Sequence, residues 1–592
     1  MSHDDHHKES WIRHYVFSTD HKMIGYQYGI TALVFLFFGL CLMMIMRWQL
    51  AYPNPEDPSI PFFGKLLARI LPGGKLTPEL YNSFGAMHGT IMVFMGVVPL
   101  AVGAFGNFVV PLQIGTVDMA FPKLNMASYW AFFVGGLVML ASFFLPGGAA
   151  DAGWTSYPPL ADITQSGTAA IFKQRLLSGQ TFWLIGMIFL ITSSLLGALN
   201  FLVTIIQLRC DGLTFMRLPF FVWAQLVTSF LLLLAFPPLE AAGVMMLMDR
   251  LAGCSFFLPE GLVVTGEIIS NTGGGAPILW QHLFWFLAHP EVYVLILPAL
   301  GIVAEIIANN TRKPLWGYKT MVYSLIFLGF MSFIVWAHHM FLTDMGTVVS
   351  AFFQTTTMII SIPSVIIITC LMLSLWGGSI RFTTPMLFAL AFLPMFGIGG
   401  LTGLPLGLAA SDIPLHDTYY VIGHFHYVVA PGTLLALFAG IYYWFPKATG
   451  RKMNDMLGKI HFWPTLIALN FVFLPMLIQG IAGVSRRLYD GGVTYAHAEP
   501  VLVWNKVMMM GAWSLALFQL PFIFNFFWSM KKGKSVAANV WDATTIEWAG
   551  CESPPIGHGN FATVPSAYRG PYEYSVPGCT NDFSPQCEKG AT

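Results

Sequence analysis

The sequence predicts an all-α, polytopic membrane protein with twelve transmembrane helices. Of its 592 residues, 56% are hydrophobic and only 10% are charged, and the mean hydropathy is +0.65. An ordinary soluble domain carries about 25% charged residues, so this composition excludes that class. The 29 basic and 29 acidic residues balance, and we expect a protein embedded in membrane lipid without a nucleic-acid partner.

Twelve apolar stretches are each long enough to cross a bilayer, which takes about 20 residues of helix. In chain order they are 24–48, 84–112, 127–146, 181–208, 218–248, 278–308, 318–343, 347–376, 383–406, 418–446, 460–483 and 500–529. Only a short Asp-Met-Gly-Thr turn separates the seventh stretch from the eighth. We divide the chain into a cytoplasmic N-terminal segment (1–23), a membrane domain (24–530) and a cytoplasmic C-terminal tail (531–592).

Lysine and arginine residues indicate the orientation of the helices. The loops on the side of the N-terminus carry about twice as many of them as the loops on the other side. Because basic loops tend to stay in the cytoplasm, we predict a multi-pass protein of the inner (cytoplasmic) membrane with both termini cytoplasmic. The N-terminal residues MSHDDHHKES lack the apolar core of a cleavable signal peptide.

Six histidines in the apolar stretches are candidate metal ligands, because ionisable side chains are costly there and usually functional. They are His88, His289, His338, His339, His424 and His426. With the orientation above, all six fall in the outer half of the membrane, a shared depth that scattered core histidines have no reason to adopt. Satisfied core histidines are the alternative, but six imidazoles without matching carboxylates favour metal ligation.

The spacing of these histidines predicts two separate centres. His424 and His426 are two residues apart, about 200° around a helix, so they face opposite flanks and one metal cannot easily bind both. His338 and His339 are adjacent, about 100° apart, and can both reach one metal. With a third imidazole, such a site suits copper or zinc.

The segment WQHLFWFLAHPEVYVLILP, residues 280–298, places polar groups in an otherwise apolar helix. His289 and Tyr293 are four residues apart and share a face, and a phenol beside a metal-bound imidazole can give up a proton and an electron together. The alternative is that Tyr293 is an ordinary amphipathic aromatic with a satisfied hydroxyl. Glu291 is a lone carboxylate near mid-membrane, which is costly unless it carries a proton or serves in a proton relay.

A proton route to Glu291 from the inner side can be traced through small polar side chains, which hold water without holding charge. Its candidate members are Asp118, Asn125, Asn107, Asn200, Ser193 and Ser194. The alternative, ordinary capping of loops by Asp and Asn, explains Asp118 and Asn125 but not Asn200, which lies within a helix.

A hard cation such as Mg²⁺ prefers oxygen ligands to imidazoles. His416 and Asp417, at the outer end of the tenth stretch, offer a candidate site for it. The seven cysteines form no C-x-x-C pair and no haem-attachment motif, so we expect neither a thiolate zinc site nor a covalently attached haem.

Several motifs together resemble subunit I of the haem-copper oxygen reductases, specifically the cytochrome c oxidase branch. They are WFLAHPEVY, WAHHM, HDTYYVIGHFHYV, GNFVVPLQIGTVDMAFPKLN, TDHK and IEWAGCESPP. The likeness covers all twelve stretches and part of the tail. It implies twelve helices that enclose two haems and one copper, and an enzyme that reduces oxygen to water while translocating protons.

The resemblance implies that His88 and His426 are the axial ligands of a low-spin haem, and that His424 is the proximal ligand of a high-spin haem. The expected haem type is A. Other residues that resemble those near the haems are Arg47 beside the low-spin haem, and Trp154, Arg486 and Arg487 near the propionates.

For the copper, the resemblance implies the ligands His289, His338 and His339. It also implies a covalent bond between His289 and Tyr293, and it assigns Tyr293 and Glu291 to the catalytic machinery. A Mg²⁺ ion at the interface with another subunit is a further expectation.

The family has two proton routes, and the sequence departs from one of them. The residues traced above match the D-type route. On the K-type route, Ile367 occupies the position of the family's lysine, and Ala304 replaces the serine at its start. Of this route, Ser364 alone persists.

Three functions are compatible with the resemblance. The first is oxygen reduction with electrons from cytochrome c through a separate copper-containing subunit II, with a subunit III as a further partner. Quinol oxidation is the runner-up, but Leu80, Ser83 and Ala51 stand where relatives of that kind carry polar quinol-binding residues. Nitric oxide reduction is the third, favoured by the missing lysine and opposed by Tyr293, whose electron is needed for O–O cleavage but not for joining two NO molecules.

Overall fold

The computed structural model describes residues 10–54, 74–163, 175–264, 266–268 and 273–589. Within them, twelve helical spans are long and apolar enough to cross a membrane, which confirms the predicted number. The spans are His21–Ala51, Pro78–Ile114, Pro122–Phe144, Gly179–Gln207, Phe220–Ala252, Pro277–Thr311, Tyr318–Met340, Thr347–Leu375, Thr384–Leu406, Tyr419–Thr449, Asp455–Ile481 and Val503–Lys532. The protein is a multi-pass membrane protein.

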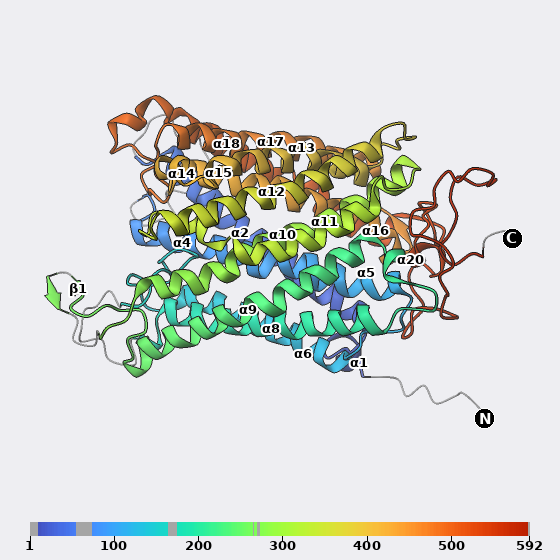
Figure 1. Cartoon of the computed structure of the whole chain (residues 1–592), viewed down its shortest axis with the longest axis horizontal. Coiled ribbons are helices and arrows are strands. Elements are labelled where there is room, and N and C mark those ends of the chain that lie inside the picture. The colour runs from blue at the N-terminus through green and yellow to red at the C-terminus, as the bar shows by residue number, and fades with distance from the viewer. Residues whose placement is uncertain (1–9, 55–73, 164–174, 265, 269–272, 590–592) are drawn as a thin grey trace.

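The helices run along the long axis of the molecule, with α10 in the middle of the bundle (Figure 1). The helical elements are α1 (Trp11–Tyr15), α2 (His21–Ala51), α4 (Pro78–Thr90), η2 (Ile91–Val97), η3 (Pro99–Ala104), α5 (Phe105–Ile114), α6 (Pro122–Ala141), η4 (Ser142–Phe144), α8 (Gly179–Gln207), η6 (Phe215–Arg217), α9 (Phe220–Ala252), α10 (Pro277–Thr311), α11 (Tyr318–Met331), η7 (Ser332–Ile334), η8 (Trp336–Met340), α12 (Thr347–Leu375), α13 (Thr384–Leu406), α14 (Ala409–Leu415), α15 (Tyr419–Tyr427), η9 (Val428–Leu434), α16 (Leu435–Thr449), α17 (Asp455–Ile481), η10 (Ala496–Val501), α18 (Val503–Leu517), α19 (Leu520–Lys532) and α20 (Ile546–Ala549). Two antiparallel pairs of short strands complete the described chain: β1 (Val263–Val264) with β2 (Glu267–Ile268), and β3 (Arg451–Lys452) with β4 (Lys534–Ser535).

Local sequence fixes where several spans begin and end. Asp20 caps α2 by accepting from the Lys22 amide at 2.8 Å, and Asn454 caps α17 by accepting from the Leu457 amide at 3.0 Å. A side-chain oxygen at this position satisfies an amide that the helix leaves unpaired. Gly115 ends α5 with a φ of 72°, a left-handed conformation that favours glycine because it lacks a Cβ atom.

The spans that carry the histidines are not regular α-helices throughout. The second span winds as a π-helix over η2 and η3, directly after His88, and the tenth does so over η9, directly after His426. In the seventh span, α11 ends at Met331, and His338 and His339 lie in the 3₁₀ segment η8. The expectation of one regular helix over 318–343 was therefore wrong at its outer end, and π and 3₁₀ turns of this kind are frequent at functional sites.

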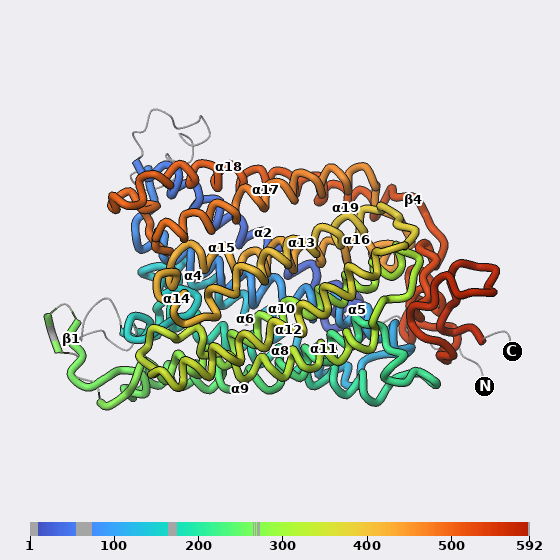
Figure 2. Tube along the Cα trace, turned by 45° about the horizontal axis from the view of Figure 1, so that its top comes forward, coloured from blue at the N-terminus to red at the C-terminus, as the bar shows by residue number. Residues whose placement is uncertain are grey.

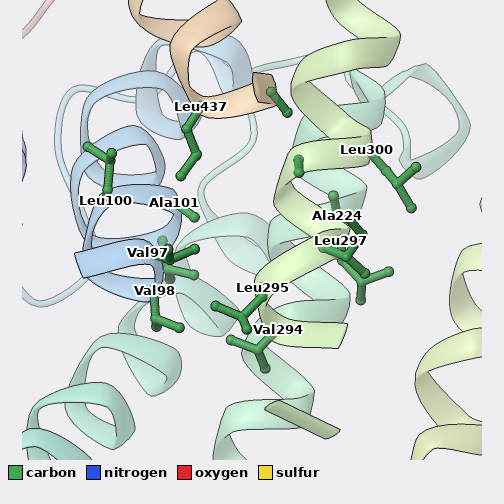
Figure 3. Packing of buried hydrophobic residues seen from close by; sticks show 14 of the residues in the cluster. Val97, Val98, Leu100, Ala101, Ala224, Val294, Leu295, Leu297, Leu300 and Leu437 are labelled. Atoms are coloured by element: carbon green, nitrogen blue, oxygen red, sulfur yellow. The ribbon is translucent and has the colours of Figure 1, made fainter. Parts of the chain in front are cut away.

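The inner part of α10 lies in an aliphatic core. Val294, Leu295, Leu297 and Leu300 pack together with side chains of η3, α9 and α16 such as Leu437 (Figure 3). All of these side chains are removed from solvent and from lipid. Burial of this kind stabilises the bundle by about 25 cal/mol per Å² of apolar surface.

The C-terminal tail covers one end of the bundle, the end at which α1 also lies (Figures 1 and 2). Arg312, at the end of α10, forms an ion pair with Asp582 at 2.7 Å. Lys447, at the end of α16, donates to the carbonyl of Cys551 at 2.8 Å. The tail is therefore fastened to the membrane domain by buried cations rather than only attached to it through the chain.

Candidate active site

All six candidate histidines line one cavity of about 1430 Å³. Its walls come from α4, α10, η8, α12, α13, α15 and α17. The elements α4 and α15 lie in the same half of the bundle (Figure 1), which agrees with the shared depth expected from the sequence. Glu291, Tyr293, Arg47, Trp154, Arg486, Arg487, His416 and Asp417 line the same cavity.

Three of the histidines converge on one point. One ligand atom from each of His289, His338 and His339 lies within 4.8 Å of the others. The Nδ1 atom of His289 is 3.2 Å from Nε2 of His339, and the Nε2 atom of His289 is 3.1 Å from the Tyr293 hydroxyl. The structure thus brings together the predicted triad and places the tyrosine beside one of its members.

A threonine that sequence reasoning missed sets the tautomer of His338. The Thr357 hydroxyl donates to the carbonyl of Phe353 at 2.6 Å, so it accepts from Nδ1 of His338, 2.9 Å away. The proton then sits on Nδ1, which leaves the lone pair of Nε2 free. Outer partners of this kind commonly orient histidine ligands of metals.

The ring of His339 is held by an aromatic partner. Trp285 stacks on it with centroids 3.7 Å apart and an angle of 11°. The indole N–H of Trp285 donates to the Tyr157 hydroxyl, so the loop between α6 and α8 supports this side of the triad. Neither contact could be read from the sequence, because Tyr157 is far from α10 in the chain.

The other three histidines have their Nδ1 atoms bonded to backbone carbonyls. His88 bonds to Gly39 at 2.9 Å, His426 to Ile422 at 2.8 Å, and His424 to Gly399 at 2.9 Å. A carbonyl can only accept, so each Nδ1 carries the proton and each Nε2 is free to bind a metal.

The two histidines of α15 face different neighbours, as their spacing predicted. His424 lies against α13, where its Nδ1 is also 3.2 Å from the Thr402 hydroxyl. His426 stacks on Phe473 of α17, with centroids 4.8 Å apart. Gly403 leaves room for the ring of His424, since a Cβ atom at this position would lie 2.7 Å from Cε1 of the imidazole.

Two buried arginine nitrogens in the cavity wall have no hydrogen-bond partner within the described chain: Nε of Arg47 and Nε of Arg486. Unpaired buried donors are costly, so these two nitrogens indicate that the cavity accommodates an anionic group. Trp154 lies beside Gly89, where a Cβ atom would be 2.9 Å from the tryptophan side chain. Arg487 packs on Gly153 of the same loop, so the predicted propionate residues share one wall.

One end of the cavity carries a charged cluster. Asp417 pairs with Arg486, and His416 bonds through Nδ1 to Asp412 at 3.0 Å, a carboxylate that sequence reasoning missed. Burial opposes ionisation of Asp417, but Arg486, His416 and Arg487 together lower its pKa below the ordinary value. Asp417 and Arg487 have positive φ values of 57° and 67°, a costly conformation that tends to occur at functional sites.

The predicted proton route is only partly assembled as expected. Asn125 donates to Asn107 at 2.6 Å, and burial raises the pKa of the half-buried Asp118. Asn200, in contrast, is bonded to both backbone groups of Phe121. It therefore ties α8 to the residue that precedes α6, and its place on the proton route stays a prediction.

Farther along the predicted proton route, Ser193 belongs to a hydroxyl cluster that the sequence did not reveal. The Tyr28 hydroxyl is 2.8 Å from Ser128 and 3.1 Å from Ser193. Ser194, on the next position of α8, makes no hydrogen bond within this cluster. Glu291 is buried with both carboxylate oxygens unpaired among the described residues.

Two buried apolar side chains occupy the positions where the sequence departs from the family's second proton route. Ile367 and Ala304 are both fully buried, and the hydroxyl of Ser364 is directed to the carbonyl of Ile360 at 3.4 Å. These side chains offer no charge and little hydrogen bonding along α10 and α12.

Comparison with known proteins agrees with this architecture. A family model described as "Cytochrome C and Quinol oxidase polypeptide I" matches residues 23–514. An alternative cytochrome c oxidase subunit 1 of Bradyrhizobium diazoefficiens is 42% identical over 98% of this chain and 94% of its own length. A cytochrome c oxidase subunit 1 of a Synechocystis species is 41% identical over 97% and 94%.

A quinol oxidase subunit 1 of Bacillus subtilis is also similar, at 39% identity over 94% of this chain and 79% of its own length. Among solved structures, a haem-copper terminal oxidase dimer has a TM-score of 0.67 with 19% identity, and the match covers 88% of this chain and 86% of that one. That likeness shows the fold. The chain therefore belongs to the cytochrome c and quinol oxidase polypeptide I family.

Proposed function

We propose that this chain is the catalytic subunit of a terminal respiratory oxidase that reduces oxygen to water and couples the reaction to proton translocation. The observation that carries the proposal is the convergence of three imidazoles within 4.8 Å, beside Tyr293 and in one cavity with three further histidines. A packed core has no use for six imidazoles whose free nitrogens all face a common space.

The residues present fit two haems and one copper. His88 and His426 would hold the low-spin haem, and His424 the high-spin haem, because a fixed Nδ1–H leaves Nε2 as the ligand atom in each. The triad would hold copper, which imidazole suits. When bound, the haems and copper supply electrons to oxygen. The guanidinium groups of Arg47 and Arg486, whose Nε atoms are unpaired, would balance the negative charge of the haem propionates.

We propose haem A rather than haem B. The wall of the cavity includes the apolar side chains of Phe438, Leu469, Leu515 and Phe522. An apolar lining of this kind would suit a haem with a long isoprenoid tail, which haem B lacks. A Mg²⁺ ion is proposed at His416 and Asp417, where Asp412 adds a further carboxylate.

The chain's own residues hold and move the protons. Asp118 takes up protons at the inner surface, and Asn125 and Asn107 lead from it toward the hydroxyls of Tyr28 and Ser193. Glu291, with no hydrogen-bond partner among the described side chains, is the group that would receive them. We assign both termini to the cytoplasmic side of the inner membrane on the basis of the basic loops.

We propose cytochrome c as the electron donor, through a copper-containing subunit II, with subunit III as a further partner. The relatives above include cytochrome c oxidases and a quinol oxidase, so the donor must be tested directly. Purified complex is supplied with reduced cytochrome c or with a quinol, and haem and copper are measured on the same sample. Oxygen uptake with quinol but not with cytochrome c would overturn the proposal of cytochrome c as donor. Absence of copper would overturn the proposed copper site at the triad.

A further inference from the structure

A buried acid and a buried amide meet where the tail covers the membrane domain. Glu547 of α20 and Gln113 of α5 are both fully buried. Nε2 of Gln113 donates to Oε1 of Glu547 at 3.0 Å. Figure 1 shows α20 beside α5 at the end of the bundle that the tail covers.

The second atom of each group has no partner within the described chain. Oε2 of Glu547 and Oε1 of Gln113 are buried and unpaired. Both are acceptors when Glu547 is ionised, and an unpaired buried acceptor is costly. Two unsatisfied acceptors on groups that are already joined by one hydrogen bond call for a single donor between them.

We propose that Glu547 is a proton-binding site, in which one proton on Oε2 donates to Oε1 of Gln113 and closes a second hydrogen bond between acid and amide. The ligand of this site is a proton from the inner aqueous phase. A neutral acid satisfies both unpaired atoms at once, with no change in the first bond.

The surrounding charges agree with a neutral Glu547. Lys447, the nearby cation, uses its ammonium group on the carbonyls of Cys551, Glu552 and Ala538 rather than on this carboxyl. Glu305 of α10, the other acid nearby, accepts from the Tyr572 hydroxyl at 2.6 Å and from the Phe221 amide at 3.2 Å.

The two buried acids interact, and like charges nearby disfavour a second ionised carboxylate, so Glu305 and Glu547 do not both carry a charge. The other titratable groups that face this site are Tyr443 and the Cys551 thiol. Burial, opposed by Gln113 and Thr545, raises the pKa of Glu547 above its ordinary value.

The site fastens a part of the tail that lies against Asp118. Beyond α20, the Asn560 amide donates to the carbonyl of Thr116 at 2.9 Å, and Nε2 of His558 is 3.7 Å from Oδ2 of Asp118. A proton on Glu547 therefore stabilises the tail where the proposed proton route begins. This last link rests on the proposed function, whereas the proton site itself does not.

The sign of the pH dependence follows from the raised pKa. Between the ordinary glutamate pKa of about 4.3 and the raised value in the docked tail, docking takes up one proton. The docked state is therefore fully stabilised at low pH, and its protection against hydrogen exchange falls about tenfold for each pH unit in this window. Above the raised pKa, the dependence ends.

The test compares the purified complex with the variants Glu547→Gln and Glu552→Gln. A glutamine at 547 can make both hydrogen bonds to Gln113 at any pH, so the tenfold slope in protection of residues 546–560 should disappear. Glu552 is exposed, and Glu552→Gln removes the same charge as a matched control, so it should keep the wild-type slope. Equal slopes in the wild type and in Glu547→Gln would overturn the proposal.

A second measurement keeps the test independent of tail dynamics. Infrared difference spectra of wild type minus Glu547→Gln should show the C=O stretch of one protonated carboxyl within the pH window given above. Gln113→Leu should shift that band, because the acid loses its acceptor. A carboxylate signal in place of the acid band would refute the site even if the tail detaches for other reasons, and neither readout requires oxidase activity.

Discussion

Replacing Thr357 by valine tests whether the hydroxyl that orients His338 supports metal binding at the triad. The hydroxyl donates to Phe353 and accepts from Nδ1 of His338 at 2.9 Å. Valine has nearly the same shape but cannot accept this bond, so Nδ1–H would be left unpaired in a buried site. The imidazole would then lose the contact that fixes its tautomer and its angle.

Loss of such an outer partner typically weakens metal affinity by about 10 to 100-fold, which corresponds to roughly 1.4 to 2.8 kcal/mol. We expect Thr357→Val to release copper at a correspondingly lower concentration of a copper chelator. Copper retained by the purified complex is measured against chelator concentration, and the optical spectrum of the haems reports on the integrity of the fold.

Thr356→Val is the matched control, because the Thr356 hydroxyl bonds only to the carbonyls of its own helix, those of Phe352 and Phe353, at 3.2 Å. It should retain copper as the wild type does. If Thr357→Val retained copper equally well, the hydroxyl would have no part in orienting the ligand, and the tautomer assigned to His338 would be wrong.

Three further outcomes follow from the site. His426→Ala should remove the low-spin haem and leave copper content unchanged, because the triad lies on the other flank of α15; metal analysis and optical spectra check this, and equal loss of copper would contradict it. Glu291→Gln should abolish oxygen turnover while the haems and copper are retained, because Glu291 is assigned to proton delivery; near-normal oxygen consumption at neutral pH would exclude it from that role. Asp118→Asn should slow anaerobic reduction of the high-spin haem as well as turnover, because Ile367 gives a second route neither charge nor a hydrogen bond, and stopped-flow spectra with normal reduction would show another proton path.

The periodicity and hydropathy of the sequence were sufficient to predict the transmembrane helices and to select the candidate histidines. Twelve apolar stretches could be counted because each has to match the thickness of the bilayer. The opposite facing of His424 and His426 follows from 3.6 residues per turn alone. The 3₁₀ winding at His338 could not be predicted, because it results from how η8 packs on α10 and α12.

The sequence did not indicate which single hydroxyl groups in the apolar helices contact functional side chains. Thr357 lies on the helix that follows His338, and Tyr28 is 165 positions from Ser193, so the packing of the helices brings each pair into contact. The partner of Asn200 could not be predicted either, because its amide bonds to the backbone of Phe121, 79 positions away. Glu547 and Gln113 lie in recognised motifs, yet their pairing across 434 positions is a tertiary feature.

The central claim is that the histidine triad and the neighbouring histidines form an oxygen-reducing centre, and the most direct measurement is gas consumption by the purified complex. Oxygen and nitric oxide are offered separately to the complex with reduced cytochrome c, and both are followed with electrodes. The account predicts rapid oxygen uptake that Tyr293→Phe abolishes, with nitric oxide consumed much more slowly. Rapid nitric oxide consumption without oxygen uptake, unaffected by Tyr293→Phe, would contradict it.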